Sequence, residues 1–143
     1  MVYRTQLKVR FGDIDHAGIV YYPRFFHFFH VTFEEFFEEV VGITYDRLLN
    51  EDRIGFPAVT VSSEFLKPLT YGDVLEVAME ARQVGNTSVT FAYVVYLAGT
   101  PEVRARSEQT LVCVDMESFR PTSIPGRCRD AFESILAPIS EAP

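Results

Sequence analysis

The stretch FFHFFHVTFEEFFEEVVG, residues 25–42, decides the fold. Phenylalanine and valine recur in it at spacings of three and four, while glutamates take most of the remaining positions. That spacing is the period of an amphipathic α-helix. We therefore predict one helix over 25–41, with Pro23 in its first turn and Gly42 as the residue that ends it. The predicted apolar stripe consists of Phe26, Phe29, Phe33, Phe36, Phe37 and Val40.

The segments on both sides of this helix alternate with a period of two, which is typical of β-strands. Residues 2–11 place Tyr3, Leu7, Val9 and Phe11 on one side of a strand. After a short irregular stretch the alternation returns in residues 57–66, 73–84, 87–97 and 103–114, and Leu75, Val77, Met79 and Ala81 share one face. A strand, a long helix and a run of strands predict an α+β fold with an antiparallel sheet on the helix. A short terminal helix is expected after Pro125.

Length, composition and charge narrow the class of protein. The 143 residues, 48% of them hydrophobic, fit a single domain over 1–143. The net charge of −7 argues against nucleic acid as a partner. The first residues lack the apolar core of a signal peptide and no apolar run is long enough to span a membrane, so we expect a cytoplasmic protein without a membrane partner. Cys113 and Cys128 fit neither a disulfide framework nor a zinc motif, and both are expected to be reduced thiols.

Acidic residues and a glycine lie just before the helix, in residues 10–26. A helix N-terminus favours negative charge, and its free N–H groups can hold a developing oxyanion. A carboxylate there, such as Asp15, can act as nucleophile or as general base in acyl transfer. The plainer alternative is that Asp13 or Asp15 caps the helix and Gly18 only serves a turn.

The segment FGDIDHAGIVYYPRFF, residues 11–26, closely resembles the signature of the hotdog-fold acyl-CoA thioesterases of the 4-hydroxybenzoyl-CoA thioesterase type. Weaker similarity continues through SSEFLKPLTYGDVLEV and GNTSVTFAYVV. The resemblance implies a long helix wrapped by an antiparallel sheet, and a homodimer or homotetramer with active sites at a subunit interface. It assigns the catalytic carboxylate to Asp15 and the oxyanion contact to the backbone N–H of Tyr22. Asp13 then becomes a structural partner, Gly18 lets the thioester approach the backbone, and no cofactor or metal is implied.

Several polar side chains are expected to contact substrate. His30 occupies the position at which the hydroxybenzoyl enzymes read a ring hydroxyl, and its spacing from the phenylalanines places it on the apolar face of the helix. It could bind a polar ring substituent or be a core histidine bonded to a carbonyl of the sheet. His16 is expected at the rim of the site or in contact with the ligand. Thr60 could line the acyl pocket, although only one of the two alternating side-chain sets of its strand can be buried.

The phosphates of coenzyme A lack an evident clamp, because Gly85, Asn86 and Thr87 stand where the hydroxybenzoyl enzymes carry a basic cluster. The remaining donors are the Ser88 hydroxyl and dispersed basic side chains, namely Lys67, Arg82, Arg120, Arg127 and Arg129. Each of these cations is by itself more typical of a solvated surface. A thioester on a carrier protein is therefore an alternative to acyl-CoA.

The sequence thus predicts a thioesterase that hydrolyses an acyl-CoA, with an aromatic acyl group somewhat favoured. A hotdog hydratase or dehydratase is an alternative, and it requires a histidine that faces the carboxylate. A noncatalytic acyl-thioester binding protein on the same fold is a further alternative.

Overall fold

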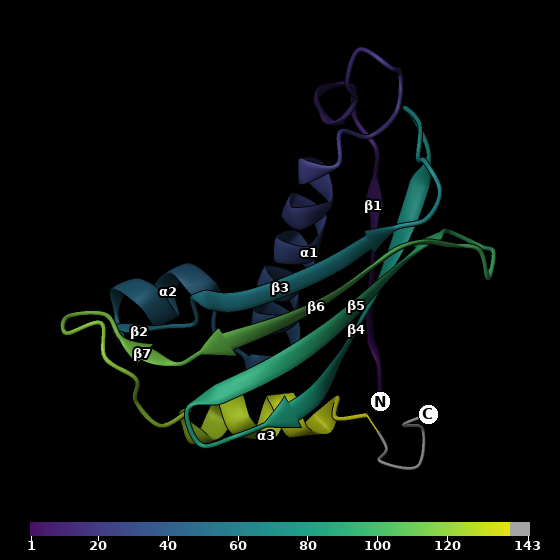
Figure 1. Ribbon diagram of the computed structural model, residues 1–143. Helices are drawn as coiled ribbons and strands as arrows, with labels where there is room; N and C mark the ends of the chain where they lie inside the picture. The colour runs from purple at the N-terminus through teal and green to yellow at the C-terminus, as the bar shows by residue number, and fades with distance from the viewer. Residues whose placement is uncertain (138–143) are drawn as a thin grey trace.

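A computed structural model describes residues 1–137 and shows one long helix packed against an antiparallel sheet (Figure 1). The five-stranded sheet has the order β1-β4-β5-β6-β3, and every neighbouring pair is antiparallel. Its strands are β1 (Tyr3–Lys8), β3 (Ala58–Phe65), β4 (Val74–Val84), β5 (Ser88–Leu97) and β6 (Val103–Val112). The predicted α+β architecture is confirmed, and the four strands after the helix end close to their predicted bounds.

The central helix α1 (Pro23–Phe36) continues into a π-helical turn, η2 (Phe37–Val41). Pro23 is at its first position, and Gly42 ends the turn at φ +90° while its N–H donates to the Phe37 carbonyl over 2.8 Å. The predicted helix is confirmed, but its apolar stripe is rotated. Phe26 and Val40 are 38% and 36% exposed, whereas the stripe is completed by other buried side chains: Phe25, Phe28, Thr32 and Val41.

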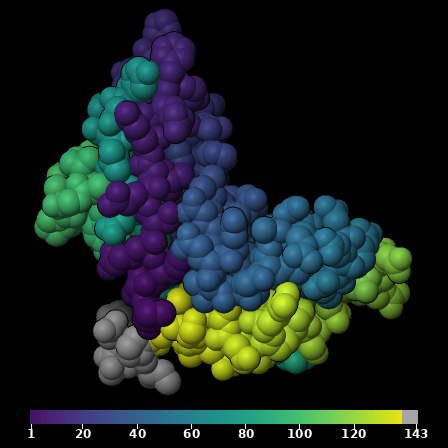
Figure 2. Space-filling model, turned by 180° about the vertical axis from the view of Figure 1, so that it is seen from behind, coloured from purple at the N-terminus to yellow at the C-terminus, as the bar shows by residue number. Residues whose placement is uncertain are grey.

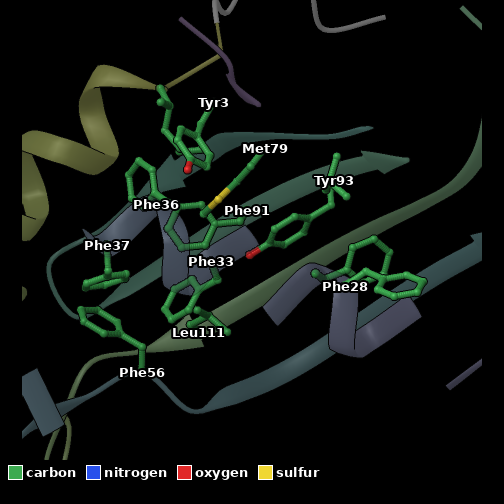
Figure 3. Close-up of a cluster of buried hydrophobic side chains, with 14 of the residues drawn as sticks. Tyr3, Phe28, Phe33, Phe36, Phe37, Phe56, Met79, Phe91, Tyr93 and Leu111 are labelled. Atoms are coloured by element: carbon green, nitrogen blue, oxygen red, sulfur yellow. The ribbon is translucent and has the colours of Figure 1, made fainter. Parts of the chain in front are cut away.

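The core lies between the buried face of α1 and the facing side of the sheet (Figure 3). Leu75, Val77, Met79 and Ala81 of β4 are fully buried, as their alternation predicts. Phe91 on β5 meets Phe33 and Phe36 of α1 at ring-centroid distances of 6.1 and 6.4 Å. The side chains of β5 and β6 that lie on the same face of the sheet as Phe91 therefore face the helix.

The first strand is shorter than its alternation predicts. It ends at Lys8, and Phe11 begins the short 3₁₀ turn η1 (Phe11–Asp13), where its side chain is 75% exposed against Tyr71. The predicted inward position of Phe11 is wrong because the chain leaves the sheet at Val9. Figure 2 shows the side opposite to Figure 1, where the purple first strand lies beside the blue helical segment and the yellow C-terminal helix lies beneath them.

Two small features occupy the stretch expected to be irregular. Helix α2 (Tyr45–Asn50) follows the central helix, and strand β2 (Ile54–Gly55) pairs with β7 (Val114–Asp115) in a separate ladder. The expected terminal helix is α3 (Gly126–Ser134), and it packs Cys128, Ala131 and Phe132 inward. No helix among residues 1–137 is long and apolar enough to cross a membrane.

Strand β3 forms an open edge of the sheet, since within residues 1–137 it pairs only with β6. Its side chains are exposed or half-buried throughout, and Val59, Val61 and Phe65 are 61%, 46% and 42% exposed. Neither of the two alternating side-chain sets of this strand is therefore buried within this chain. An edge strand with solvent-exposed apolar side chains is suited to pairing with another strand.

Candidate active site

Asp13 anchors the loop between β1 and the central helix. It is 5% exposed, and its Oδ1 accepts a hydrogen bond from Nε of Arg24 at 2.9 Å and lies 2.8 Å from Nη2 of the same guanidinium. Its Oδ2 accepts from the Arg10 N–H at 2.8 Å. The Asp13 carboxylate is thus occupied on both oxygens and ties the loop to the first turn of α1. This agrees with the structural role expected for it.

Asp15 lies in a tight hairpin, in which Ile14 pairs with Val20. Its Oδ1 accepts from the Ala17 N–H at 2.8 Å, while its Oδ2 has no hydrogen-bond partner in the described part of the chain. Gly18 takes a φ of +82° in this turn, where a side chain would be strained, and the space beside its Cα is open. The half-buried carboxylate of Asp15 therefore keeps one oxygen available beside an unobstructed stretch of backbone.

The helix N-terminus adds a hydrogen-bond donor to this loop. Tyr22 precedes the first residue of α1, and no side chain caps the helix there. The Tyr22 N–H has no acceptor among residues 1–137, while the neighbouring Tyr21 N–H donates to the Asp13 carbonyl at 2.9 Å. Neither aspartate caps α1, so the capping alternative is wrong. A free N–H at a helix start, close in the chain to a free carboxylate oxygen, can bind a carbonyl oxygen that gains negative charge.

His30 lies at the border of the buried stripe rather than within it. Its side chain is 57% exposed, and its Nδ1 lies 2.8 Å from Oε2 of Glu34 one turn later. One edge of the ring packs near Phe33 and Tyr45, at centroid distances of 5.5 and 6.0 Å. The alternative of a core histidine bonded to the sheet is wrong. His16 is exposed on the hairpin, and its position at the rim of the site stays a prediction.

A chamber of about 210 Å³ opens beside His30, between α1, α2 and the start of β3. Its walls include His30, Phe33, Tyr45, Ala58, Tyr93 and Gln109. The Tyr45 hydroxyl accepts from the Phe56 N–H at 2.9 Å. Burial raises the pKa of the Tyr93 hydroxyl far above its ordinary value, so this group stays protonated and can act as a donor. We call this cavity the α1–β3 chamber.

Tyr93 and Gln109 were missed by sequence reasoning. A signal was present for Gln109, which is a polar residue at a position of its strand that faces the helix, opposite Phe91. Tyr93 gave no such signal, because an aromatic side chain at an inward position is the ordinary pattern of a core.

The structure does not bring Thr60 and Ser88 to Asp15. Thr60 is in register with Thr110, whose hydroxyl bonds Thr90 at 2.9 Å on the sheet face turned away from α1. Ser88 begins β5 beside α3, at the opposite end of the molecule from the hairpin (Figure 1). Its carbonyl accepts from the Gly85 N–H at 2.8 Å and so closes the turn before its strand.

Most of the dispersed cations are held by other groups. Lys67 lies 3.0 Å from Glu102, and Arg82 lies 3.2 Å from Glu80. Arg129 donates to the Gly85 carbonyl at 2.7 Å and so fixes the turn before β5. Arg82 also borders a second hollow of about 320 Å³ on the outer sheet face, whose lining includes several charged side chains. Among residues 1–137 no cluster of histidine, cysteine or acidic side chains is placed to hold a metal ion.

Comparison with known proteins relates this loop and fold to a family. The chain is 24% identical over 129 residues to the acyl-CoA thioesterase YbgC of Haemophilus influenzae, covering 90% of this chain and 93% of that protein. It is 29% identical over 125 residues to a 1,4-dihydroxy-2-naphthoyl-CoA hydrolase of Nostoc punctiforme, covering 87% and 82%. The solved structure of Slr0204, a 1,4-dihydroxy-2-naphthoyl-CoA thioesterase from Synechocystis, superposes with a TM-score of 0.86 at 21% identity, covering 96% of this chain and all of that one.

These likenesses confirm the hotdog fold and the thioester-hydrolase class that the sequence predicts. The model of the thioesterase-like superfamily matches residues 9–137, which include the Asp15 hairpin, the central helix and the whole sheet after it. The chain therefore belongs to the thioesterase-like superfamily.

Proposed function

We propose that this enzyme hydrolyses an acyl-CoA to the free acid and coenzyme A, and that it favours an aromatic acyl group. The observation that carries the proposal is the loop in which Asp15 keeps a free carboxylate oxygen and Tyr22 a free N–H. The aromatic preference is supported by the aromatic walls of the α1–β3 chamber and by the naphthoyl-CoA substrates named for two similar proteins.

The chemistry follows from these groups. The Tyr22 N–H would donate to the thioester carbonyl oxygen and stabilise the negative charge that it gains when the carbon is attacked. The Asp15 carboxylate would either attack the carbon itself or remove a proton from the attacking water. The carbon–sulfur bond then breaks and the thiolate of coenzyme A leaves. If an acyl–Asp15 anhydride forms, water cleaves it and releases the acid.

The open edge of β3 supports a homodimer, which could pair again into a tetramer. Antiparallel pairing of two β3 edges would complete a sheet across both subunits and cover Val59 and Val61. Phe65, at one end of the strand, packs 5.9 Å from Tyr22, whereas Ala58 at the other end lines the chamber. Antiparallel pairing would therefore bring the Asp15 hairpin of one subunit to the chamber of its partner.

The experiment is release of free thiol from a panel of aryl- and alkyl-CoA thioesters by the unaltered enzyme and by Asp15→Asn. Asparagine keeps an oxygen for the Ala17 N–H but can neither attack nor take a proton, so we expect at least a hundredfold loss of turnover, about the size of a general-base contribution. Asp130→Asn, an exposed change on α3, is the matched control and should keep full activity.

Other outcomes would point to the alternatives. If the unaltered chain binds acyl-CoA tightly and releases no thiol, the protein is a binding subunit. Hydration of an enoyl-CoA without thiol release would identify a hydratase. Release of acid from an acyl-carrier protein, but from no CoA ester, would change the donor and keep the reaction.

A further inference from the structure

The chain between β3 and β4, residues 66–73, runs beside the hairpin described above (Figure 1). The Val20 N–H donates to the Leu69 carbonyl at 2.9 Å, and an adjacent bridge pairs Ile19 with Thr70. Leu69 is fully buried, so this part of the chain is anchored in the core as well as in the ladder. We call this stretch the β3–β4 segment, and it forms one side of the hairpin.

Both groups of the proposed mechanism lie close to this contact. The Ile19 carbonyl accepts from the Asp15 N–H at 2.9 Å, and Tyr22 is only two residues beyond Val20. A displacement of Val20 would therefore change the position of the free Asp15 oxygen relative to the free Tyr22 N–H.

Arg104 on β6 holds the near end of the β3–β4 segment. Its carbonyl accepts from the Leu66 and Lys67 N–H groups, at 2.8 and 3.2 Å, and its Nη1 donates to the Pro68 carbonyl. Proline has no N–H, so this carbonyl is the backbone group through which Pro68 can be hydrogen-bonded. The Arg104 side chain thus ties the chain directly before Leu69.

The far end of the segment is held in a different way. The Asp73 carboxylate accepts from the N–H and the hydroxyl of Thr70, at 2.8 and 3.1 Å. The Gly72 N–H donates to the Val9 carbonyl at 3.1 Å. These contacts lie on the β4 side, after Leu69, and leave the tie before it to Arg104.

An irregularity in the sheet places Arg104. In the β5–β6 ladder Val95 faces Ala105 and Tyr96 faces Val103, so Arg104 between them is the extra residue of a bulge. Bulges of this kind redirect a side chain and interrupt the regular pairing of the strand.

The Arg104 side chain also carries a cost to stability. It is 14% exposed, and its Nε is the one buried side-chain nitrogen or oxygen without a hydrogen-bond partner in the described part of the chain. Its Nη2 lies 3.5 Å from Oε1 of Glu102, an atom that Lys67 also contacts at 3.0 Å. A buried donor without an acceptor is destabilising, which points to the Pro68 contact as the use of this side chain.

We infer that Arg104 is a positioning residue, which holds Pro68 to β6 and thereby fixes the Asp15 hairpin and the Tyr22 N–H relative to each other. This inference rests on the proposed function, since the groups that it positions are those of the proposed mechanism. Arg104 acts through the β3–β4 segment and not by contact with the substrate.

The test is Arg104→Met, which keeps an unbranched side chain but cannot donate to Pro68. We expect kcat for the best acyl-CoA of the thioester panel to fall about tenfold or more, because misplaced reacting groups lose rate steeply. KM should stay within about threefold of its unaltered value. The free energy of unfolding should change little, because the substitution removes the unpartnered Nε together with the useful bond.

Two controls should keep the unaltered kcat. Arg106→Met is the same change two residues along β6, at an exposed position. Glu102→Gln weakens the ion pair with Arg104 and leaves the bond to Pro68 intact. If Arg104→Met does not fold, Arg104→Gln, which is too short to reach the same carbonyl, takes its place under the same criteria.

Amide hydrogen exchange followed by NMR measures the positioning without any turnover. In Arg104→Met the Val20 and Asp15 N–H groups, both bonded in the hairpin contact, should exchange at least about tenfold faster. The N–H groups that pair β4 with β5 in the centre of the sheet should exchange at unchanged rates.

Faster exchange at Val20 together with a lower kcat supports the inference. Unchanged exchange at Val20 overturns it, and so does faster exchange that leaves kcat intact. Exchange that accelerates equally throughout the sheet would make Arg104 a general structural residue and the inference wrong. If the unaltered protein releases no thiol, the proposed function fails alone, and exchange at Val20 still decides whether Arg104 holds the hairpin.

Discussion

The guanidinium of Arg24 closes on the carboxylate of Asp13, with Nε and Nη2 at 2.9 and 2.8 Å from the same oxygen. Arg24 is in the first turn of α1, and Asp13 is in the loop that leads to the Asp15 hairpin. The pair therefore fixes the hairpin relative to the helix N-terminus. The proposed mechanism uses one group from each of these two places, the Asp15 carboxylate on the hairpin and the Tyr22 N–H at the helix N-terminus. Their relative position therefore depends on the Asp13–Arg24 pair.

Asp13→Ala should lower both stability and turnover. It leaves the Arg10 N–H without its acceptor and Arg24 without its partner, at a cost of about 2 kcal/mol in the free energy of unfolding. Arg24 is 38% exposed and can recover water, which keeps the cost from being larger. Urea unfolding and thiol release measure the two effects. Glu51→Gln, which breaks the solvent-exposed pair with Arg47, is the control and should leave the free energy of unfolding nearly unchanged. If Asp13→Ala leaves both the free energy of unfolding and the turnover unchanged, the loop is held by other contacts.

Val61→Lys should dissociate the proposed dimer. A charge in the middle of β3 would have to enter the shared sheet, a position at which natural proteins place lysine to prevent strand pairing. We expect light scattering to report monomers and activity to fall with them. Val40→Lys introduces the same charge at a position 36% exposed on the η2 turn and should leave the assembly intact. A Val61→Lys protein that keeps the unaltered mass would place the subunit interface elsewhere.

Mixed dimers should recover activity that their parents lack. One parent carries Asp15→Asn, and the other carries Ala58→Phe, which fills the chamber from β3. If each site joins the hairpin of one subunit to the chamber of the other, a mixed dimer contains one intact site. Refolding the two together should then restore up to about a quarter of the unaltered activity, because half of the dimers are mixed and each has one working site of two. Sites contained within single subunits would stay inactive after mixing.

The cysteine thiols should be unreactive in the native protein at pH 8. Burial raises the pKa of Cys113 to about 11 and that of Cys128 to about 12, so both stay protonated, whereas the thiolate is the reactive form. Ellman's reagent should count no protein thiol until urea is added.

The folded state holds these protons more tightly than the unfolded chain, whose thiols titrate near pH 9. The stabilising contribution is therefore complete below pH 9 and declines as the pH rises from 9 to 12. The free energy of unfolding should change less between pH 8 and pH 10 in a Cys113→Ala variant than in the unaltered protein. An equal change in the two proteins would contradict this expectation.

The long elements could be predicted because their periodicity is strong. The helix over 25–41 and the strands after it follow from spacings of three to four and of two. The burial of Val41 in place of Val40 could not be predicted from an α-helical period, because the π turn at Phe37–Val41 has more residues per turn. Phe26 and His30 precede this turn and lie in the regular helix, whose buried face runs through Phe25, Phe28, Phe29, Thr32 and Phe33. Phenylalanine occurs on both candidate faces of this helix, so its period alone does not decide which face meets the sheet.

The candidate site was predictable where it is local. Asp15, Gly18 and Tyr22 lie within one short segment, and their turn follows from the aspartate and glycine in it. The partner of Asp13 lies eleven residues away on the helix, and the chamber joins His30 to Tyr93 and Gln109 from different strands. Such contacts depend on strand register and on the twist of the sheet, which no local pattern specifies. The role of Thr60 could not be decided for the same reason, since neither face of its strand is buried within this chain.

The uncovered edge of β3 also bears on the rate law. In the proposed dimer a lone subunit has a hairpin and a chamber, but the two do not face each other. Dilution would then dissociate the dimers and so reduce the number of complete active sites. At low enzyme concentration the initial velocity would rise with the square of the total chain concentration. How much of this enzyme a cell makes would thus set the activity of each copy as well as the number of copies.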